Sequence, residues 1–215
     1  MNRQKFSKRR LPSIPFRVLV IGRANAGKTS ILQRVCETTE SPVIYRTSLN
    51  VDGTKRREKV ILHPSSERGE HKIRDELVFA NHEGYVFHDS RGFESGSEEE
   101  LRRVQKFVMD KSQEKKLKDR LHAIWFCIPM DSERPGLDML HFNDICPDRN
   151  EVPLVAVFTK YDAFMHMMRC KVEDDDDGAG LPAENQAQTV FENEFLSRLD
   201  EKHKYVRLEA RETLR

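Results

Sequence analysis

The stretch FRVLVIGRANAGKTS, residues 16–30, carries the strongest fold signal in the chain. It opens with a run of mostly apolar and β-branched residues, which is typical of a buried parallel strand. Residues 22–29 then fit the pattern G-x-x-x-x-G-K-[ST] and lead directly into a helical stretch over residues 30–36. Glycines let backbone N–H groups approach a polyphosphate closely, and a helix N-terminus favours its negative charge. The sequence therefore predicts a strand, a phosphate-binding loop and a helix.

Each position of this loop has an expected role at the phosphates. We expect Lys28 to reach the β- and γ-phosphates and the Thr29 hydroxyl to ligate Mg²⁺. The other residues expected to contact the polyphosphate are Gly22, Asn25, Ala26, Gly27 and Ser30. The alternative is a glycine turn formed by chance, and the predicted strand and helix around the loop argue against it.

Strands and helices alternate along the rest of the chain. Further strands are predicted over residues 121–128, 152–158 and 205–208. Further helices are predicted over residues 98–118, 137–145 and 187–199. This alternation favours an α/β fold with a mostly parallel sheet and helices on both faces.

One hairpin interrupts the alternation. The extended runs 71–80 and 85–90, joined by a turn at 81–84, predict one antiparallel strand pair. The polar segments 38–69 and 173–182 receive no assigned element, and the second contains an acidic run that is typical of a solvated loop.

Composition narrows the class of protein. With 215 residues the chain fits a single domain, expected over residues 16–215 after a disordered basic leader at 1–15. Charged residues make up 34%, and no apolar run approaches the length of a membrane span. A net charge of +1 gives no global field for nucleic acid, so no specific nucleic-acid partner is expected. The four cysteines lack C-x-x-C spacing, which favours a reducing, cytoplasmic compartment.

A second motif, Asp89-Ser90-Arg91-Gly92, follows the predicted strand at 85–90. An aspartate at a strand end can hold Mg²⁺ through water, and the Gly92 N–H can face a γ-phosphate. The pattern D-x-x-G also occurs at Asp175 and Asp177, but no strand precedes those positions. Position therefore favours Asp89 as a metal residue.

A third motif, Thr159-Lys160-Tyr161-Asp162, ends the predicted strand at 152–158. The Asp162 carboxylate can accept two hydrogen bonds from N1 and N2 of guanine, which adenine cannot donate, while the Lys160 stem covers the purine ring. K-x-D alone is usually a surface charge pair. In order after the two phosphate motifs, it predicts binding of GTP and GDP rather than ATP.

Together these motifs resemble the translation-factor-like P-loop GTPases, the group that includes Ras, Era and the tRNA-modifying GTPase MnmE. The run HDSRGFESGSEEEL, residues 88–101, is similar to fungal G-domain-containing proteins. The resemblance spans Phe16 to about Ala210. It implies a three-layer G domain with one antiparallel strand, slow Mg²⁺-dependent GTP hydrolysis used as a conformational switch, and a protein effector or regulator.

Three departures from the family pattern change the expected chemistry. Thr159 stands where the family's base-recognition motif usually has asparagine. The threonine hydroxyl can make only part of the contacts that the asparagine makes to the loop and the base. Phe93 stands where Ras-like enzymes place a water-orienting glutamine, so hydrolysis needs another group. We also expect the chain to lack the family's terminal helix after the strand at 205–208, and Glu209-Ala210 to take the place of its last base-contacting motif.

Two further residues are assigned through the resemblance. Asn25 matches the asparagine with which Era and MnmE help to hold a potassium ion beside the phosphates, whereas its alternative role is to favour a turn. With Lys28 and Gly92 it forms the expected catalytic set. Ser66 is the expected hydroxyl that senses the γ-phosphate and ligates the metal, with Ser65 and Thr54 as alternatives.

Two other function classes stay open from the sequence. One is an ATP-using P-loop enzyme, which would have no need of T-K-x-D after a strand. The other is a nucleotide-binding interaction module with little or no hydrolysis, which Phe93 and the missing helix favour.

Overall fold

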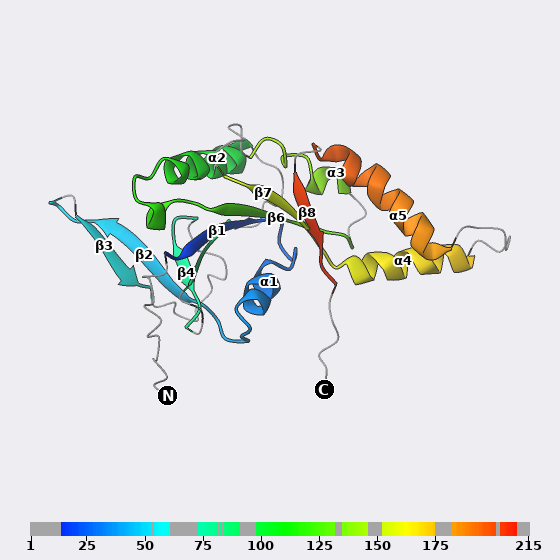
Figure 1. The fold of residues 1–215 in the computed structure, drawn as a ribbon, viewed down its shortest axis with the longest axis horizontal. Helices are drawn as coiled ribbons and strands as arrows, with labels where there is room; N and C mark the ends of the chain where they lie inside the picture. The colour runs from blue at the N-terminus through cyan, green and yellow to red at the C-terminus, as the bar shows by residue number, and fades with distance from the viewer. Residues whose placement is uncertain are drawn as a thin grey trace, which may run out of the picture.

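The computed structural model describes residues 14–52, 54–60, 73–80, 82, 84–90, 98–131, 135–145, 152–174, 182–200 and 203–209. The predicted leader and the acidic segment lie largely outside these ranges. The strands are β1 Phe16–Ile21, β2 Val43–Leu49, β3 Lys55–Lys59, β4 Glu76–Val78, β5 Tyr85–Asp89, β6 Ala123–Pro129, β7 Leu154–Thr159 and β8 Lys204–Arg207. They form one eight-stranded sheet in the order β3-β2-β4-β5-β1-β6-β7-β8 (Figure 1).

The α-helices are α1 Lys28–Val35, α2 Glu98–Ser112, α3 Pro135–Asp138, α4 Tyr161–Asp174 and α5 Ala183–Glu194. Two short 3₁₀ segments, η1 Leu117–Asp119 and η2 Leu196–Arg198, follow α2 and α5. Within the described ranges, none of these helices combines the length and the apolar character needed to cross a membrane.

The sheet is mixed and mostly parallel, as the sequence predicted. β1 pairs in parallel with β5 and β6, and β7 pairs in parallel with β6 and β8. The pairs β2–β3, β2–β4 and β4–β5 are antiparallel, so β3 and β4 both run against the other strands. The expectation of a single antiparallel strand was therefore wrong. The unassigned segment 38–69 contains β2 and β3, and the exposed KRREK of β3 has no apolar alternation to reveal it.

Two helix predictions need correction, and one helix was not predicted. The helix predicted over 98–118 ends at Ser112, and the chain then continues into η1. The helix predicted over 137–145 is a single turn, α3, although Phe142 and Ile145 after it are fully buried. In that segment the apolar spacing indicated burial rather than helix. α4 was missed, although its buried Phe164 and Met168 have the i, i+4 spacing of a helix face.

Two hydrophobic clusters flank the sheet. Leu19 and Ile21 of β1 belong to the larger cluster, which also contains residues of α2, α4 and α5. Val18 and Val20 belong to the smaller cluster, which contains Leu32 of α1. Because successive side chains of a strand point to opposite faces, α1 packs on one face and α2, α4 and α5 pack on the other.

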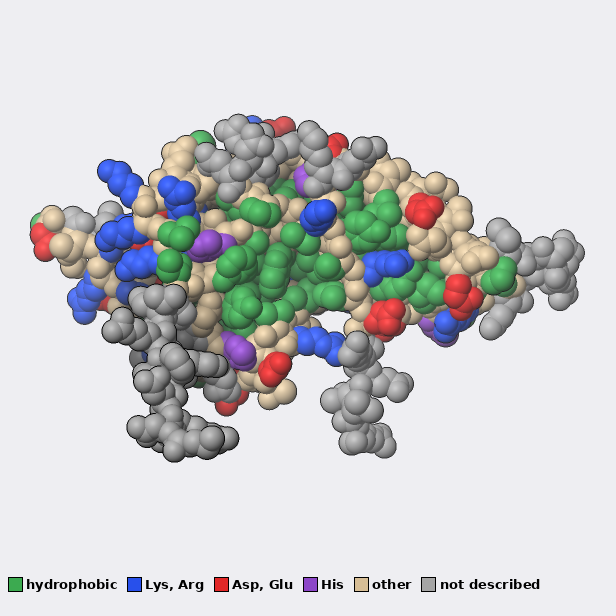
Figure 2. Space-filling view, viewed as in Figure 1, with side chains coloured by type: hydrophobic (Ala, Val, Ile, Leu, Met, Phe, Trp, Pro, Cys, Tyr) green, Lys and Arg blue, Asp and Glu red, His purple; other side chains and the backbone are tan. Residues whose placement is uncertain are grey.

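The face that carries α1 is only partly covered by the described residues. Trp125 and Val155 are partly exposed there, and Phe16 and Val206 are 42% and 43% exposed. Figure 2 shows hydrophobic side chains gathered over the middle of the molecule. The predicted lack of a terminal helix concerns residues beyond 209, which lie outside the described residues.

Candidate functional site

The loop predicted to bind phosphates leaves the carboxyl end of β1 in the centre of the sheet and enters α1 (Figure 1). Its glycines are required by the backbone. A Cβ atom on Gly22 would lie 2.6 Å from the carbonyl oxygen of Cys127 in β6. Gly27, directly before α1, has a left-handed φ of 77°. Asn25 has a φ of 60°, which asparagine tolerates better than most residues, so its role in the turn is visible in the backbone.

Lys28 folds back over this loop. Its Nζ donates hydrogen bonds to the carbonyl oxygens of Gly22 and Arg23, at 2.7 and 2.8 Å. An ammonium group has three N–H donors, so one remains to point at an anion. The first N–H groups of α1 also face outward from the helix end, since such groups have no partner within a helix. The loop therefore brings hydrogen-bond donors and positive charge together at one place.

The T-K-x-D motif contacts the phosphate loop directly. Thr159 is buried, and its hydroxyl donates a hydrogen bond of 3.1 Å to the carbonyl oxygen of Ala26. Lys160 has a left-handed φ of 56°, and its Nζ bonds the Asp131 carboxylate at 2.6 Å. Asp131 also lies 3.8 Å from Arg23 of the loop. Two segments more than 130 positions apart therefore meet at one end of the sheet.

Asp89 ends β5 and is aligned with Val20, the residue two positions before the loop. The charges of Asp89 and Lys28 both act on the thiol of Cys127. Burial raises the pKa of the Cys127 thiol to about 12, while Lys28 lowers that pKa and Asp89 raises it. The carboxylate and the lysine therefore both lie near Cys127, at the edge of the sheet where the loop begins.

The other predicted residues divide into two groups. Asn25, Thr29 and Ser30 are exposed on the loop and the first turn of α1, and Asp162 is exposed in the first turn of α4. Gly92, Phe93, Ser65 and Ser66 lie outside the described residues.

The structure does not bring Thr54 to the phosphate loop. Its hydroxyl bonds Asp52 at 2.6 Å, and the residue lines a cavity together with Arg17, near the beginning of β1. Glu209 is exposed after β8, and the preceding Leu208 accepts a hydrogen bond from the N–H of Tyr161 at 3.1 Å. The segment after β8 therefore reaches the start of α4, whereas Ala210 is outside the described residues.

The arrangement fits a magnesium ion with few protein ligands. Among the described residues, no group of three or more His, Cys, Asp or Glu side chains could hold a metal ion. Magnesium in phosphate sites is usually held by one or two protein oxygens, with the remaining ligands supplied by phosphates and water. Thr29 and Asp89, both at the loop end of the sheet, are the residues that suit such an ion.

Sequence reasoning missed Arg23 and Asp131, which link the loop to Lys160. The available signal for Asp131 was its position just after β6, at the same sheet edge as the other motifs. No protein-family model matches the chain, and a search of curated proteins finds no match. The assignment of a function therefore rests on the motifs and their geometry.

Proposed function

We propose that this chain binds guanine nucleotides and hydrolyses GTP slowly with Mg²⁺, as a conformational switch. The observation that carries the proposal is the hydrogen bond between Thr159 and Ala26. A phosphate loop alone suits any nucleoside triphosphate. A base-reading motif seated against that loop suits guanine. Packing of α1 on one face and of α2, α4 and α5 on the other supports a three-layer G domain with an added β2–β3 hairpin.

In this proposal the loop holds the phosphates mainly through backbone groups. The third N–H of Lys28 and the N–H groups at the start of α1 donate to phosphate oxygens. Gly22 and Gly27 keep the backbone in the shape that permits this approach. A bound Mg²⁺ would be held by Thr29 and Asp89, with Ser66 as a further predicted ligand, and would neutralise phosphate charge.

The base would lie between the loop and the start of α4. The ion pair with Asp131 fixes the Lys160 stem, which can then cover one face of the purine. The Asp162 carboxylate, exposed two residues after Lys160, can accept hydrogen bonds from guanine N1 and N2. Gly92 would contact the γ-phosphate, and the cytoplasm remains the proposed compartment.

The first test measures the affinities for GTP, GDP, ATP and xanthosine triphosphate by calorimetry. Thr159→Val removes the hydroxyl and leaves the Ala26 carbonyl unpaired, at a cost of about 1–3 kcal/mol. We expect guanine-nucleotide affinity to fall, whereas the matched Thr159→Ser variant keeps the hydroxyl and most of the affinity. Full GTP affinity in Thr159→Val would show that the Thr159–Ala26 hydrogen bond does not support guanine binding, and the proposal would lose its main argument.

The second variant in the same assay is Asp162→Asn. It should weaken GTP binding and improve xanthosine triphosphate binding, because an amide can donate to the xanthine oxygen. Asp144→Asn, at an exposed carboxylate on another segment, is the control and should change neither affinity. Equal changes in the affinities for GTP and ATP in Asp162→Asn would favour an ATP-using enzyme. Tight GTP binding without any single-turnover hydrolysis would favour an interaction module.

A further inference from the structure

A second concave site lies at the opposite end of β1 from the phosphate loop. A cavity of about 780 Å³ opens between the sheet and the η1 segment. Its floor carries Arg17 of β1, Tyr45 of β2 and Arg57 of β3, and its wall carries Lys116 and Lys118. Because Arg17 is near the start of β1 and the loop follows the end of β1, the two sites are separate.

The lining of this cavity is strongly basic. Its cationic side chains outnumber its carboxylates by five to two. These side chains are Arg17, Lys55, Arg57, Lys116 and Lys118, against Glu76 and Asp119. Lys55 is also paired at 3.0 Å with Glu114, which lies outside the lining. The whole chain has a net charge of only +1, so positive charge is concentrated here. Figure 2 shows lysine and arginine side chains gathered at the β2–β3 end of the molecule.

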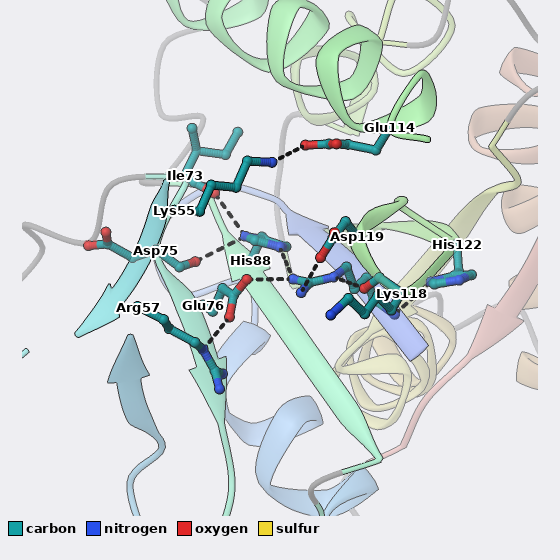
Figure 3. A network of polar contacts seen from close by, with 11 residues as sticks. Lys55, Arg57, Ile73, Asp75, Glu76, His88, Glu114, Lys118, Asp119 and His122 are labelled. Atoms are coloured by element: carbon teal, nitrogen blue, oxygen red, sulfur yellow. Dashed lines mark hydrogen bonds and ion pairs between the residues drawn. The ribbon is translucent and has the colours of Figure 1, made fainter. Parts of the chain in front are cut away.

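Both carboxylates are already engaged by arginines (Figure 3). The buried Glu76 accepts hydrogen bonds from Arg17 Nη1 and from Arg57 Nε, each at 2.8 Å. Asp119 lies 3.8 Å from Arg17 Nη2. Arg17 also donates from Nε to the carbonyl oxygen of Lys118 at 2.6 Å, which ties the wall to the floor. The network therefore gives the cavity a fixed shape.

The two wall lysines have no such partner. Both are exposed, and across the described part of the chain no carboxylate lies within ion-pair distance of Lys116 or Lys118. On the floor, the Arg57 guanidinium lies 3.9 Å from the centroid of the Tyr45 ring, which holds both side chains in place. Unpaired ammonium groups above an ordered basic floor are a suitable arrangement for an anion.

We propose that this cavity binds a compact ligand carrying several phosphate groups. The excess of positive charge favours a multivalent anion, and lysine ammonium groups bind phosphate as point charges. The limited volume favours a small ligand over a long polymer. A free polyphosphorylated molecule and the head group of a phosphoinositide share this chemistry. The site does not depend on the proposed nucleotide site.

The test uses inositol hexakisphosphate as the soluble probe in calorimetry with the full chain. Lys116→Glu/Lys118→Glu reverses two charges at exposed positions, and the affinity should fall about a hundredfold, since each charged contact is worth roughly tenfold. The control is Lys115→Glu/Arg56→Glu, which makes the same change in net charge outside the cavity lining. Arg56 and Arg57 point to opposite faces of β3. The control should lose less than about threefold, and unchanged thermal unfolding checks that both variants fold.

The second arm uses vesicles of phosphatidylcholine with phosphatidylinositol 4,5-bisphosphate. Vesicle binding that inositol hexakisphosphate displaces identifies the head group as the source, whereas binding of the soluble probe alone identifies a free ligand. An equal loss of affinity in the cavity variant and in the control, for these probes or for a short RNA, would overturn the proposal. Such a result would indicate binding by diffuse surface charge. Failure of the wild-type chain to bind either probe would also overturn it. The proposal would also be overturned if Lys28→Ala no longer bound the soluble probe, because that result would place the probe at the phosphate loop.

Discussion

The two ends of β1 carry the two proposed anion sites, which are built in different ways. At its carboxyl end, the site consists mostly of backbone groups, shaped by Gly22 and Gly27 and closed by one lysine. At its amino end, the cavity consists of side chains around the buried Arg17, held by ion pairs and hydrogen bonds. A backbone site depends on a few glycines and on the helix end. A side-chain site depends on every charge in its network, so the two ends should respond differently to mutation, cations and pH.

The largest expected effect is on the amino end. Glu76→Ala would leave the buried Arg17 without its closest carboxylate, because both side chains are less than 10% exposed in their 2.8 Å pair. Breaking a buried pair in this way costs about 3–5 kcal/mol in the free energy of unfolding. The control, Glu58→Ala, removes an exposed pair with Arg56 and should cost less than about 1 kcal/mol. Urea unfolding measures both, and equal costs would show that the amino-end network does not depend on its buried ion pair.

The next prediction concerns the carboxyl end. If Asn25 helps to hold a potassium ion, replacing sodium with potassium should accelerate GTP turnover, and Asn25→Ala should abolish that difference. Loss of a charge-stabilising group typically costs a hundredfold or more in rate, about 3 kcal/mol. Ala24→Gly, at the neighbouring exposed position, serves as the control. An Asn25→Ala protein that keeps its full potassium response would leave the residue with its role in the turn alone.

The smallest effect comes from His88, behind the basic cavity. Its Nδ1 lies 3.1 and 3.0 Å from the carbonyl oxygens of Ile73 and Asp75, so Nδ1 carries the proton and Nε2 faces Arg17. Burial lowers the pKa of His88 to about 3, and the charges of Lys111 and Arg17 add to this effect. The neutral ring therefore suits this position.

Protonation of His88 should consequently oppose folding. An unfolded histidine has a pKa of about 6.5, so below that pH the unfolded chain binds a proton that the folded chain excludes. Stability should be retained above pH 6.5 and fall by roughly 2 kcal/mol as the pH drops to 5. Urea unfolding at both values checks this, with His88→Gln expected to lose most of the dependence. The phosphate-loop end of β1 should add little to this pH dependence of stability. An unaltered pH dependence in His88→Gln would assign it to other groups.

Local sequence was sufficient where the signal was contiguous. The strand at 16–21, the glycine loop and the start of α1 are adjacent in the chain, and each has strong local preferences. The predicted antiparallel pairing of the runs 71–80 and 85–90 was likewise confirmed, although the first strand covers only Glu76–Val78 of the expected range. β3 escaped prediction because an exposed edge strand of charged residues has no hydrophobic period. Helix α4 was overlooked although its apolar spacing was visible.

Only the tertiary structure could show which distant groups meet. Residue types predicted the T-K-x-D motif, but the contact between Thr159 and Ala26, and the link of Asp131 to both Arg23 and Lys160, depend on the order of β1, β6 and β7 in the sheet. The basic cavity had no signal in the sequence at all. Its cations come from three separate segments and are concealed in a net charge of +1, because total charge records the sum of the charges and not their positions.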